Sequence, residues 1–292
     1  MNDVNASFAN QVASYVADGE WKALRDQVGH FIADPQPNTL ARIFTAIPRT
    51  VKSAGKAEFI TLDGPTHTET APLPLVVKDW PLVRLVRVWV LTRVPALEQP
   101  SYLSLIERLF SYGDVEELAA LYAALPIYHY PAAWQLRCME GIRSNMAPVR
   151  QAIIVNNHYP SQFLDEGAWN QLVLKAFFTD EDIPNIIGLK RRNNLRLAQA
   201  LVDYAYELHA AKRNINPMLW ILAAPYLDDR AHQLMVQILQ EDMALLTHKA
   251  IVYAFRQSNF GPAADFITRN SELTDLLDTA GTPWDDWLDQ TN

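Results

Sequence analysis

Apolar residues recur at the spacing of an α-helix through most of this chain, and that spacing limits the possible folds more than any other feature. The clearest case covers residues 191–213, where apolar side chains lie three and four positions apart. That side carries Leu195, Ala198, Leu201, Val202, Ala205, Leu208 and His209. Convincing alternation of apolar and polar residues is missing, and residues 58–62 are only a weak strand candidate. The pattern predicts an all-α fold.

Shorter helical stripes fill the rest of the chain and are separated by glycine, proline or polar turns. We expect helices at 8–16, 21–32, 38–47, 80–94, 101–110, 115–125, 132–143, 147–156, 166–178, 217–224, 230–240, 244–255 and 262–269. Helices that follow one another in pairs with short turns are typical of stacked helical hairpins. We therefore expect a HEAT- or armadillo-like α-solenoid, although no clean repeat period is present.

The length and composition fit a single elongated domain over residues 1–292. A hydrophobic content of 49% is enough for a sizeable core. Within this domain we expect N-terminal helices at 1–47, a long loop at 48–79, a helical core at 80–270 and an acidic tail at 271–292. A loop of that length is often a lid or a binding loop, and a disordered surface segment is the alternative.

Negative charge is concentrated at the C-terminal end. The chain has a net charge of −8, and residues 270–292 contain six acidic side chains and no Lys or Arg. Trp284, Trp287 and Leu288 are expected to form a turn that docks this tail. Because the apolar content of the tail is mostly its two tryptophans, we expect the helical core to fold without it.

Composition and motifs also exclude several classes of protein. The negative net charge gives no general basic character for nucleic acid binding. The single cysteine, Cys138, excludes an intramolecular disulfide and a multi-cysteine zinc site, and it is expected to be a small buried side chain. The scattered histidines, His209 included, show no metal-ligand spacing. We therefore expect no metal and no cofactor.

Neither a signal peptide nor a transmembrane segment is indicated. The N-terminus has no basic region before an apolar run, and no segment has eighteen consecutive apolar residues. These features predict a cytoplasmic protein. The chain also has no P-loop, G-x-G-x-x-G, G-x-S-x-G or H-E-x-x-H motif, which argues against an enzyme without excluding one.

The segment from 138 to 178 combines helical stripes with an unusual density of polar side chains. Asparagine favours caps and turns, where its amide bonds to nearby backbone groups, so these residues are either structural staples or the wall of a ligand site. Asn156 continues the stripe of Val149 and Ala152 and is expected to be a buried staple. The ligand-binding candidates are Glu140, Arg143, Asn145, Asn156, Asn157, Tyr159, Asp165, Trp169, Asn170 and Lys175, of which Arg143, Asn170 and Lys175 are the strongest.

A second group of candidates is basic. The helix at 80–94 is apolar around most of its circumference and yet carries Arg84 and Arg87 one turn apart. A buried arginine needs a carboxylate, such as Glu107 or Glu116, or an anionic ligand. Arg49, Arg84 and Arg87 are therefore secondary candidates for ligand binding.

Three motifs in this chain resemble those of the EboA family. They are E-G-I-R-S-N-M at 140–146, N-N-H-Y-P at 156–160 and A-W-N-Q-L-V-L-K-A-F-F at 168–178. Weaker matches are Pro48-Arg49 with Gly55-Lys56, Trp80 with Arg84, Asp114 with Glu117-Leu118, and Leu195, Ala198, Asp203-Tyr204-Ala205 and Glu207. The resemblance covers about residues 38–225. It departs from the family pattern at His158, where proline is expected, and at 190–192, where basic residues replace an acidic stretch.

The resemblance implies a protein encoded beside a UbiA-like prenyltransferase and hydrolase-, isomerase- and dehydroquinate-synthase-like enzymes. Such clusters are linked to secondary-metabolite biosynthesis and to metabolite traffic toward the periplasm. The leading hypothesis is a non-catalytic helical binding or scaffold protein that holds a small anionic or prenylated metabolite, or contacts other proteins of the ebo-type pathway. One alternative is an enzyme with Glu140, His158, Asp165 and Lys175 as acid/base groups. Another is a purely structural solenoid for protein–protein interaction.

Overall fold

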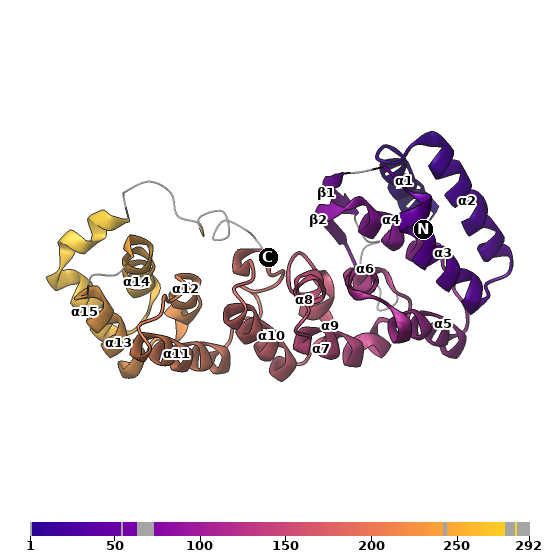
Figure 1. The fold of residues 1–292 in the computed structure, drawn as a ribbon. Helices are drawn as coiled ribbons and strands as arrows, with labels where there is room; N and C mark the ends of the chain where they lie inside the picture. The colour runs from indigo at the N-terminus through magenta and orange to yellow at the C-terminus, as the bar shows by residue number, and fades with distance from the viewer. Residues whose placement is uncertain (1, 54, 63–72, 242–243, 278–283, 285–292) are drawn as a thin grey trace. The chain divides into compact units, whose positions relative to one another are not determined.

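Helices make up most of the structure, a computed structural model that describes residues 2–53, 55–62, 73–241, 244–277 and 284 (Figure 1). The mostly helical fold predicted from the spacing of apolar residues is thereby confirmed. Contacts divide the chain into two compact units, Met1–Trp169 and Asn170–Asn292. Their boundary lies inside α10 (Glu166–Phe178), a helix whose ends agree with the predicted range 166–178.

Unit 1 holds most of the helices and one small sheet. Its elements before α10 are α1 (Asn2–Ala13), α2 (Asp18–Ala33), α3 (Pro37–Thr50), β1 (Lys56–Leu62), β2 (Leu75–Pro81), α4 (Leu82–Thr92), α5 (Gln99–Tyr112), α6 (Val115–Ala123), η1 (Leu125–Ile127), η2 (Pro131–Trp134), α7 (Gln135–Arg143), α8 (Ala147–Ile154) and α9 (His158–Phe163).

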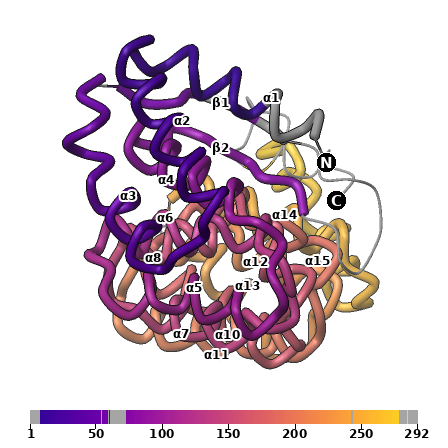
Figure 2. The backbone as a smooth tube through the Cα atoms, turned by 90° about the vertical axis from the view of Figure 1, so that its right-hand side faces the viewer, coloured from indigo at the N-terminus to yellow at the C-terminus, as the bar shows by residue number. Residues whose placement is uncertain are grey.

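Helix α4 is the centre of unit 1, because it contacts α1, α3, α6 and both strands (Figure 2). Nine of its eleven residues are buried, as the apolar sequence of this segment predicts. A helix that is hydrophobic around most of its circumference is expected in the interior of a domain. The two arginines of α4 therefore lie where charge is costly.

Arg87 is bonded to groups from two of the helices that contact α4, namely α6 and α3. Its Nη2 atom is 3.3 Å from Oε1 of Glu117 in α6, and its Nε donates to the backbone oxygen of Phe44 in α3 at 3.3 Å. Burial lowers the pKa of the Arg87 guanidinium, and the charge of Glu117 opposes that shift. The other oxygen of Glu117 accepts from the Asp114 backbone N–H in a capping box that starts α6. One carboxylate thus fixes both α4 and the first turn of α6.

Arg84 has a weaker partner. Its Nη2 atom is 3.4 Å from Oε2 of Glu116, whose side chain is about half exposed, and its buried Nε has no hydrogen-bond partner. The expected pairing of these arginines with carboxylates is confirmed for Glu116, and Glu117 is an additional partner. Glu107 instead pairs with Arg137.

The segment at 48–79 is not the continuous loop that we expected. Strands β1 and β2 form an antiparallel pair with Lys56 opposite Pro81 and Leu62 opposite Leu75. Buried residues alternate with more exposed ones at the start of β2, where Leu75 and Val77 point into the core. Residues 63–72 lie outside the described part of the chain, so the lid and disorder alternatives for that stretch stay predictions.

Unit 2 continues with helices only, in the residues that the structure describes. Its elements after α10 are η3 (Ile183–Asn185), α11 (Leu195–Ala210), α12 (Met218–Ala223), η4 (Ala224–Tyr226), α13 (Asp229–Leu239), α14 (Leu245–Gln257), α15 (Gly261–Arg269) and η5 (Ser271–Leu276).

The core of unit 2 is α12. All six of its residues are buried, and it contacts α11 and α14. Trp284 is also buried, as expected for a docking turn, whereas Trp287, Leu288 and most of the acidic tail lie outside the described residues. Among the helices that the structure describes, none is both long and apolar enough to cross a bilayer.

We predict that Arg87→Ala lowers the free energy of unfolding by about 3–5 kcal/mol, because it leaves the carboxylate of Glu117 buried without its partner. Arg84→Ala should cost less, since Glu116 is half exposed and can be solvated. Urea unfolding of both variants measures the difference. Lys22→Ala, on the exposed side of α2, is the control and should change stability by no more than about 0.5 kcal/mol. Equal losses for Arg84→Ala and Arg87→Ala would contradict this ranking.

Candidate functional site

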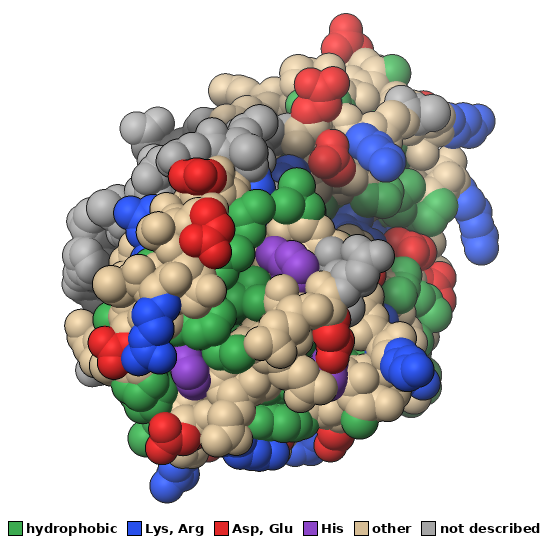
Figure 3. Space-filling model, turned by 90° about the vertical axis from the view of Figure 1, so that its left-hand side faces the viewer, with side chains coloured by type: hydrophobic (Ala, Val, Ile, Leu, Met, Phe, Trp, Pro, Cys, Tyr) green, Lys and Arg blue, Asp and Glu red, His purple; other side chains and the backbone are tan. Residues whose placement is uncertain are grey.

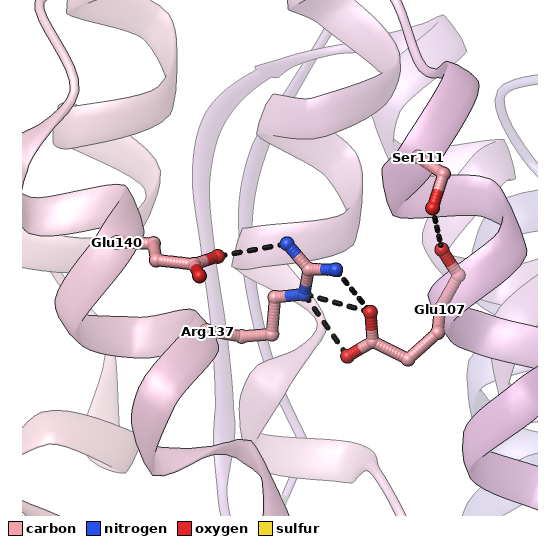
Figure 4. Close-up of polar contacts among 4 residues, drawn as sticks. All are labelled: Glu107, Ser111, Arg137 and Glu140. Atoms are coloured by element: carbon pink, nitrogen blue, oxygen red, sulfur yellow. Dashed lines mark hydrogen bonds and ion pairs between the residues drawn. The ribbon is translucent and has the colours of Figure 1, made fainter.

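Glu140, the first of the ligand-binding candidates in the segment 138–178, is part of an ion-pair cluster in unit 1 (Figure 4). Arg137 Nη1 donates to Glu140 Oε2 at 2.7 Å, and Arg137 Nε lies 2.9 Å from both carboxylate oxygens of Glu107. The guanidinium also lies over the Phe110 ring, 5.1 Å from its centroid. The hydrogen bond with Glu107 is the main reason why the pKa of Arg137 is raised. The cluster links α7 to α5 and occupies the carboxylate of Glu140.

The residues after Glu140 pack tightly against α6 and α8. A Cβ atom added at Gly141 would lie 2.6 Å from Cε1 of Tyr122 and would also overlap Ile153, so only glycine fits there. Cys138 is buried, as its sequence context predicts, and burial raises the pKa of its thiol. Burial also raises the pKa of Tyr122 to about 12. Gly141, the second residue of the family motif at 140–146, is thus a packing residue.

Arg143 and Asn145 lie at the exposed end of the same motif. Arg143 is the last residue of α7, and Asn145 lies in the turn before α8. The Ser144 hydroxyl accepts from the Met146 backbone N–H at 3.1 Å in this turn, and α8 itself begins after Met146 without a side-chain cap. Arg143 has no ion-pair partner within the described part of the chain, and it keeps its place as a candidate.

The structure corrects the expected role of Asn156. Helix α8 ends at Ile154, and Asn156 is half-buried with a left-handed φ of 56°, so it does not continue the buried face. The buried staple is Asn157. Its Nδ2 donates to the backbone oxygens of Ala152 at 2.9 Å and Tyr122 at 3.3 Å, and its Oδ1 caps α9 by accepting from Tyr159 N–H at 2.9 Å.

Other candidates in unit 1 also have structural contacts. Tyr159 is buried, and its hydroxyl donates to the Pro131 backbone oxygen at 2.5 Å. Asp165 accepts from the Ala168 backbone N–H at 2.7 Å at the start of α10, and Trp169 is fully buried. Arg49 is exposed in the last turn of α3.

In unit 2, Asn170 forms a reciprocal pair of amide hydrogen bonds with Asn194, at 3.2 and 2.9 Å. Asn194 also caps α11 by accepting from the Leu197 backbone N–H at 3.0 Å. This arrangement is that of a staple between α10 and the start of α11. Lys175 is half-buried, and the described residues offer it no ion-pair partner. It therefore stays a candidate.

The ligand site predicted from the segment 138–178 would draw on residues of both units. Glu140, Arg143 and Asn156 belong to unit 1, whereas Asn170 and Lys175 belong to unit 2. Within each unit, Glu140, Asn157 and Asn170 are bonded to structural partners rather than to one another. The meeting of these candidates in one groove therefore stays a proposal.

An open cavity of about 660 Å³ lies in unit 2, where the C-terminal ends of α11 and α13 meet the start of α14. Two cations, Lys212 and Arg213, follow α11 at its edge. The cavity is lined by His209, Lys212, Arg213, Asn214, Gln237, Glu241 and Ala244.

The end of α11 positions these two cations. The Lys212 N–H donates to the His209 oxygen at 3.0 Å, and the Arg213 N–H donates to the Leu208 oxygen at 2.9 Å. These two bonds are the Schellman arrangement that closes a helix, with Lys212 at the left-handed position and a φ of 53°. Glycine usually occupies that position, because a larger residue there costs about 1–2 kcal/mol. The left-handed conformation of Lys212 therefore lowers the local stability of the turn.

His209 and Glu241 form the opposite side of the cavity. The imidazole Nε2 lies 3.1 and 3.0 Å from the two carboxylate oxygens of Glu241, and Gln237 donates to the same carboxylate at 3.3 Å. The hydrogen bond with His209 is the first reason why the pKa of Glu241 is lowered. The carboxylate of Glu241 is thus already hydrogen-bonded within the cavity, whereas Lys212 and Arg213 have no ion-pair partner among the described residues.

Sequence reasoning did not find this cavity. It placed His209 on the apolar side of the longest helical stripe, where the structure shows it half-buried, but it did not single out Lys212-Arg213. The available signal was a pair of basic residues directly after the longest helical stripe, at a helix end whose dipole already favours cations. A smaller cavity of about 210 Å³ near Asp203, Tyr226 and Arg230 is partly filled by the ion pair of Arg230 with Asp203.

The fold and the cavity together define a mostly helical protein with an open, cation-edged pocket. Within the described residues, no group of three or more His, Cys, Asp or Glu side chains could hold a metal ion. The chain belongs to the EboA family. The family model for metabolite traffic protein EboA matches residues 4–224, which confirms the resemblance found in the motifs.

The family match includes Lys212 and Arg213 but ends before Gln237, Glu241 and Ala244. The description of the family points to a role in metabolite traffic. Neither the curated proteins nor the solved structures contain a match to this chain.

We predict that Asn157→Ala lowers the free energy of unfolding by about 1–3 kcal/mol, because it removes the cap of α9 and leaves two backbone carbonyls without their donor. Asn156→Gly is the matched control, since glycine adopts the left-handed conformation of residue 156 without strain. Thermal and urea unfolding of both variants test this assignment. A larger loss for Asn156→Gly than for Asn157→Ala would show that Asn156 is the staple after all.

We also predict that Asn170→Ala costs about 1 kcal/mol of stability through the lost amide pair. Asn194→Ala should cost about 0.5–2 kcal/mol more, because it also removes the cap of α11. Metabolite yield in cells that carry the neighbouring genes should fall only in step with the amount of folded protein. Abolished yield with unchanged melting of Asn170→Ala would instead identify Asn170 as a ligand contact.

Proposed function

We propose that this protein is a non-catalytic helical binding protein that holds a small anionic metabolite for a secondary-metabolite pathway. The observation that supports this proposal is the cavity edged by Lys212 and Arg213. Its volume of about 660 Å³ falls within the range of about 300–1,000 Å³ that is common for small-molecule sites.

The chemistry of the lining favours an anion. The two cations lie beside the amides of Asn214 and Gln237, which can donate further hydrogen bonds. The guanidinium of Arg213 has the planar geometry that suits carboxylate and phosphate groups. Glu241 would repel an anion less than a free carboxylate would, because it is already bonded to His209.

Binding rather than catalysis is supported by the state of the proposed acid/base groups. Glu140 is bound to Arg137, and Asp165 caps α10, so neither carboxylate is set aside for proton transfer. The lining residues that the structure describes include no Ser, Thr, Cys or Tyr side chain. Among these residues, the pair of His209 and Glu241 favours the alternative of an enzyme. Turnover of a pathway intermediate that is lost in His209→Gln would support that alternative.

In this proposal the protein works in the cytoplasm and takes part in moving a metabolite toward the periplasm. Its partners would be other proteins of the ebo-type pathway, and its ligand an anionic or prenylated intermediate. Arg143 and Lys175 are proposed as further contacts to a ligand or partner, because both are cationic and neither is used in an ion pair among the described residues.

The test is a double variant, Lys212→Gly with Arg213→Ala, expressed in cells that carry the neighbouring genes. It removes both cations, and glycine suits the left-handed turn at residue 212, so the variant should melt no lower than the wild type. We expect metabolite yield to fall at least tenfold at an unchanged level of folded protein.

Lys22→Ala with Arg25→Ala is the matched control, since it removes the same charges from the exposed side of α2. Its yield should equal that of the wild type. Normal yield from the Lys212 and Arg213 variant would mean that the cavity is not the functional site.

A further inference from the structure

Two exposed leucines lie beside the cationic cavity. Ala244 lines the cavity, and the next two residues, Leu245 and Leu246, begin α14 with exposed fractions of 55% and 40%. From the third position onward the same helix buries its apolar side chains, including Ala250, Ile251 and Phe255. The exposure is thus confined to the turn that adjoins the cavity.

We propose that the cavity takes an anionic amphiphile, with its negatively charged head at Lys212 and Arg213 and its apolar chain along Leu245 and Leu246. This inference rests on the proposed function and names the class of ligand. The two cations line the cavity, and the leucines directly follow Ala244, which lines it as well. A ligand that reaches both must carry charge and hydrocarbon in one molecule.

The size and lining of the cavity support a chain as well as a head. A volume of about 660 Å³ exceeds what a single small anion fills. The methylene stems of Lys212 and Arg213 can cover hydrocarbon while their charged ends meet the head. Each methylene removed from water strengthens binding about fourfold, so even a partly covered chain would matter.

The observations favour a single bound molecule over a membrane surface. The leucines adjoin a cavity rather than a continuous apolar face, and the chain has a net charge of −8, which opposes association with an anionic bilayer. The face shown in Figure 3 carries acidic and basic side chains interspersed with hydrophobic and histidine ones. Among the residues described on that face, no broad basic surface is visible.

The experiment is calorimetric titration of the full chain with three probes: octyl phosphate below its micelle concentration, inorganic phosphate and octanol. We expect octyl phosphate to bind at least tenfold more tightly than either of the other two. A tenfold difference corresponds to about 1.4 kcal/mol. Saturation at one molecule per chain is expected for a single site.

Two variants separate the head from the chain. Lys212→Gly with Arg213→Ala should reduce the affinity for octyl phosphate to the affinity measured for octanol. Leu245→Ser with Leu246→Ser should reduce the affinity for octyl phosphate to the affinity measured for inorganic phosphate. Leu136→Ser with Leu195→Ser changes two other exposed leucines and should bind octyl phosphate like the wild type. Melting curves of all variants confirm that each is folded.

Three results would overturn the inference, and each bears differently on the proposed function. Equal affinity for octyl phosphate and inorganic phosphate would leave a site for small anions, and the proposed function would stand. Absence of binding by either phosphate would remove both proposals. Flotation with phosphatidylglycerol vesicles that needs both the cations and the leucines would reassign the feature to a membrane surface.

Discussion

The ion pair between Arg87 and Glu117 is the contact on which the interior of unit 1 depends. Helix α4 is apolar enough to be buried on nearly all sides, so its arginine must find a carboxylate inside the protein. Glu117 supplies it and caps α6 at the same time, and the Phe44 carbonyl on α3 accepts a further bond from Arg87. The positions of α3, α4 and α6 are thereby coupled through one guanidinium.

The same need to give buried polar groups hydrogen-bond partners explains the polar side chains of the segment 138–178. Its asparagines lie where helices end and new ones begin, so backbone groups there lack helical partners. Asn157 supplies bonds to three such groups, and Asn170 pairs with the residue that caps α11. The high polar density in the family motifs therefore comes first from the many helix ends in a short stretch of chain. Arg143 and Lys175 are exceptions, since no such contact within the described part of the chain uses them.

The candidate pocket is also made from helix ends, with a different outcome. The Schellman turn after α11 places a lysine where glycine would be less strained, next to a second cation. The ends of α13 and α14 add a carboxylate already bonded to histidine and two leucines that face solvent. A strained turn, two cations without an ion-pair partner among the described residues, and exposed hydrocarbon are each unfavourable for stability, and their coincidence at one cavity is what a binding site would require.

The periodicity of the sequence determined the helices, because the burial of one helical face depends on residues three and four positions apart. That local rule placed α10 at residues 166–178 and predicted that α4 would be buried. It missed the pairing of β1 with β2, since Leu62 and Leu75 are brought together by hydrogen bonds between distant segments. It also chose Asn156 over Asn157 as the buried staple, because one partner of the Asn157 amide is the Tyr122 backbone oxygen in another helix, which local spacing does not reveal. The cavity was decided by tertiary structure alone, since residues 209 and 212–214 meet Gln237, Glu241 and Ala244 only when α11 packs on α12 and α14 packs on both α12 and α13.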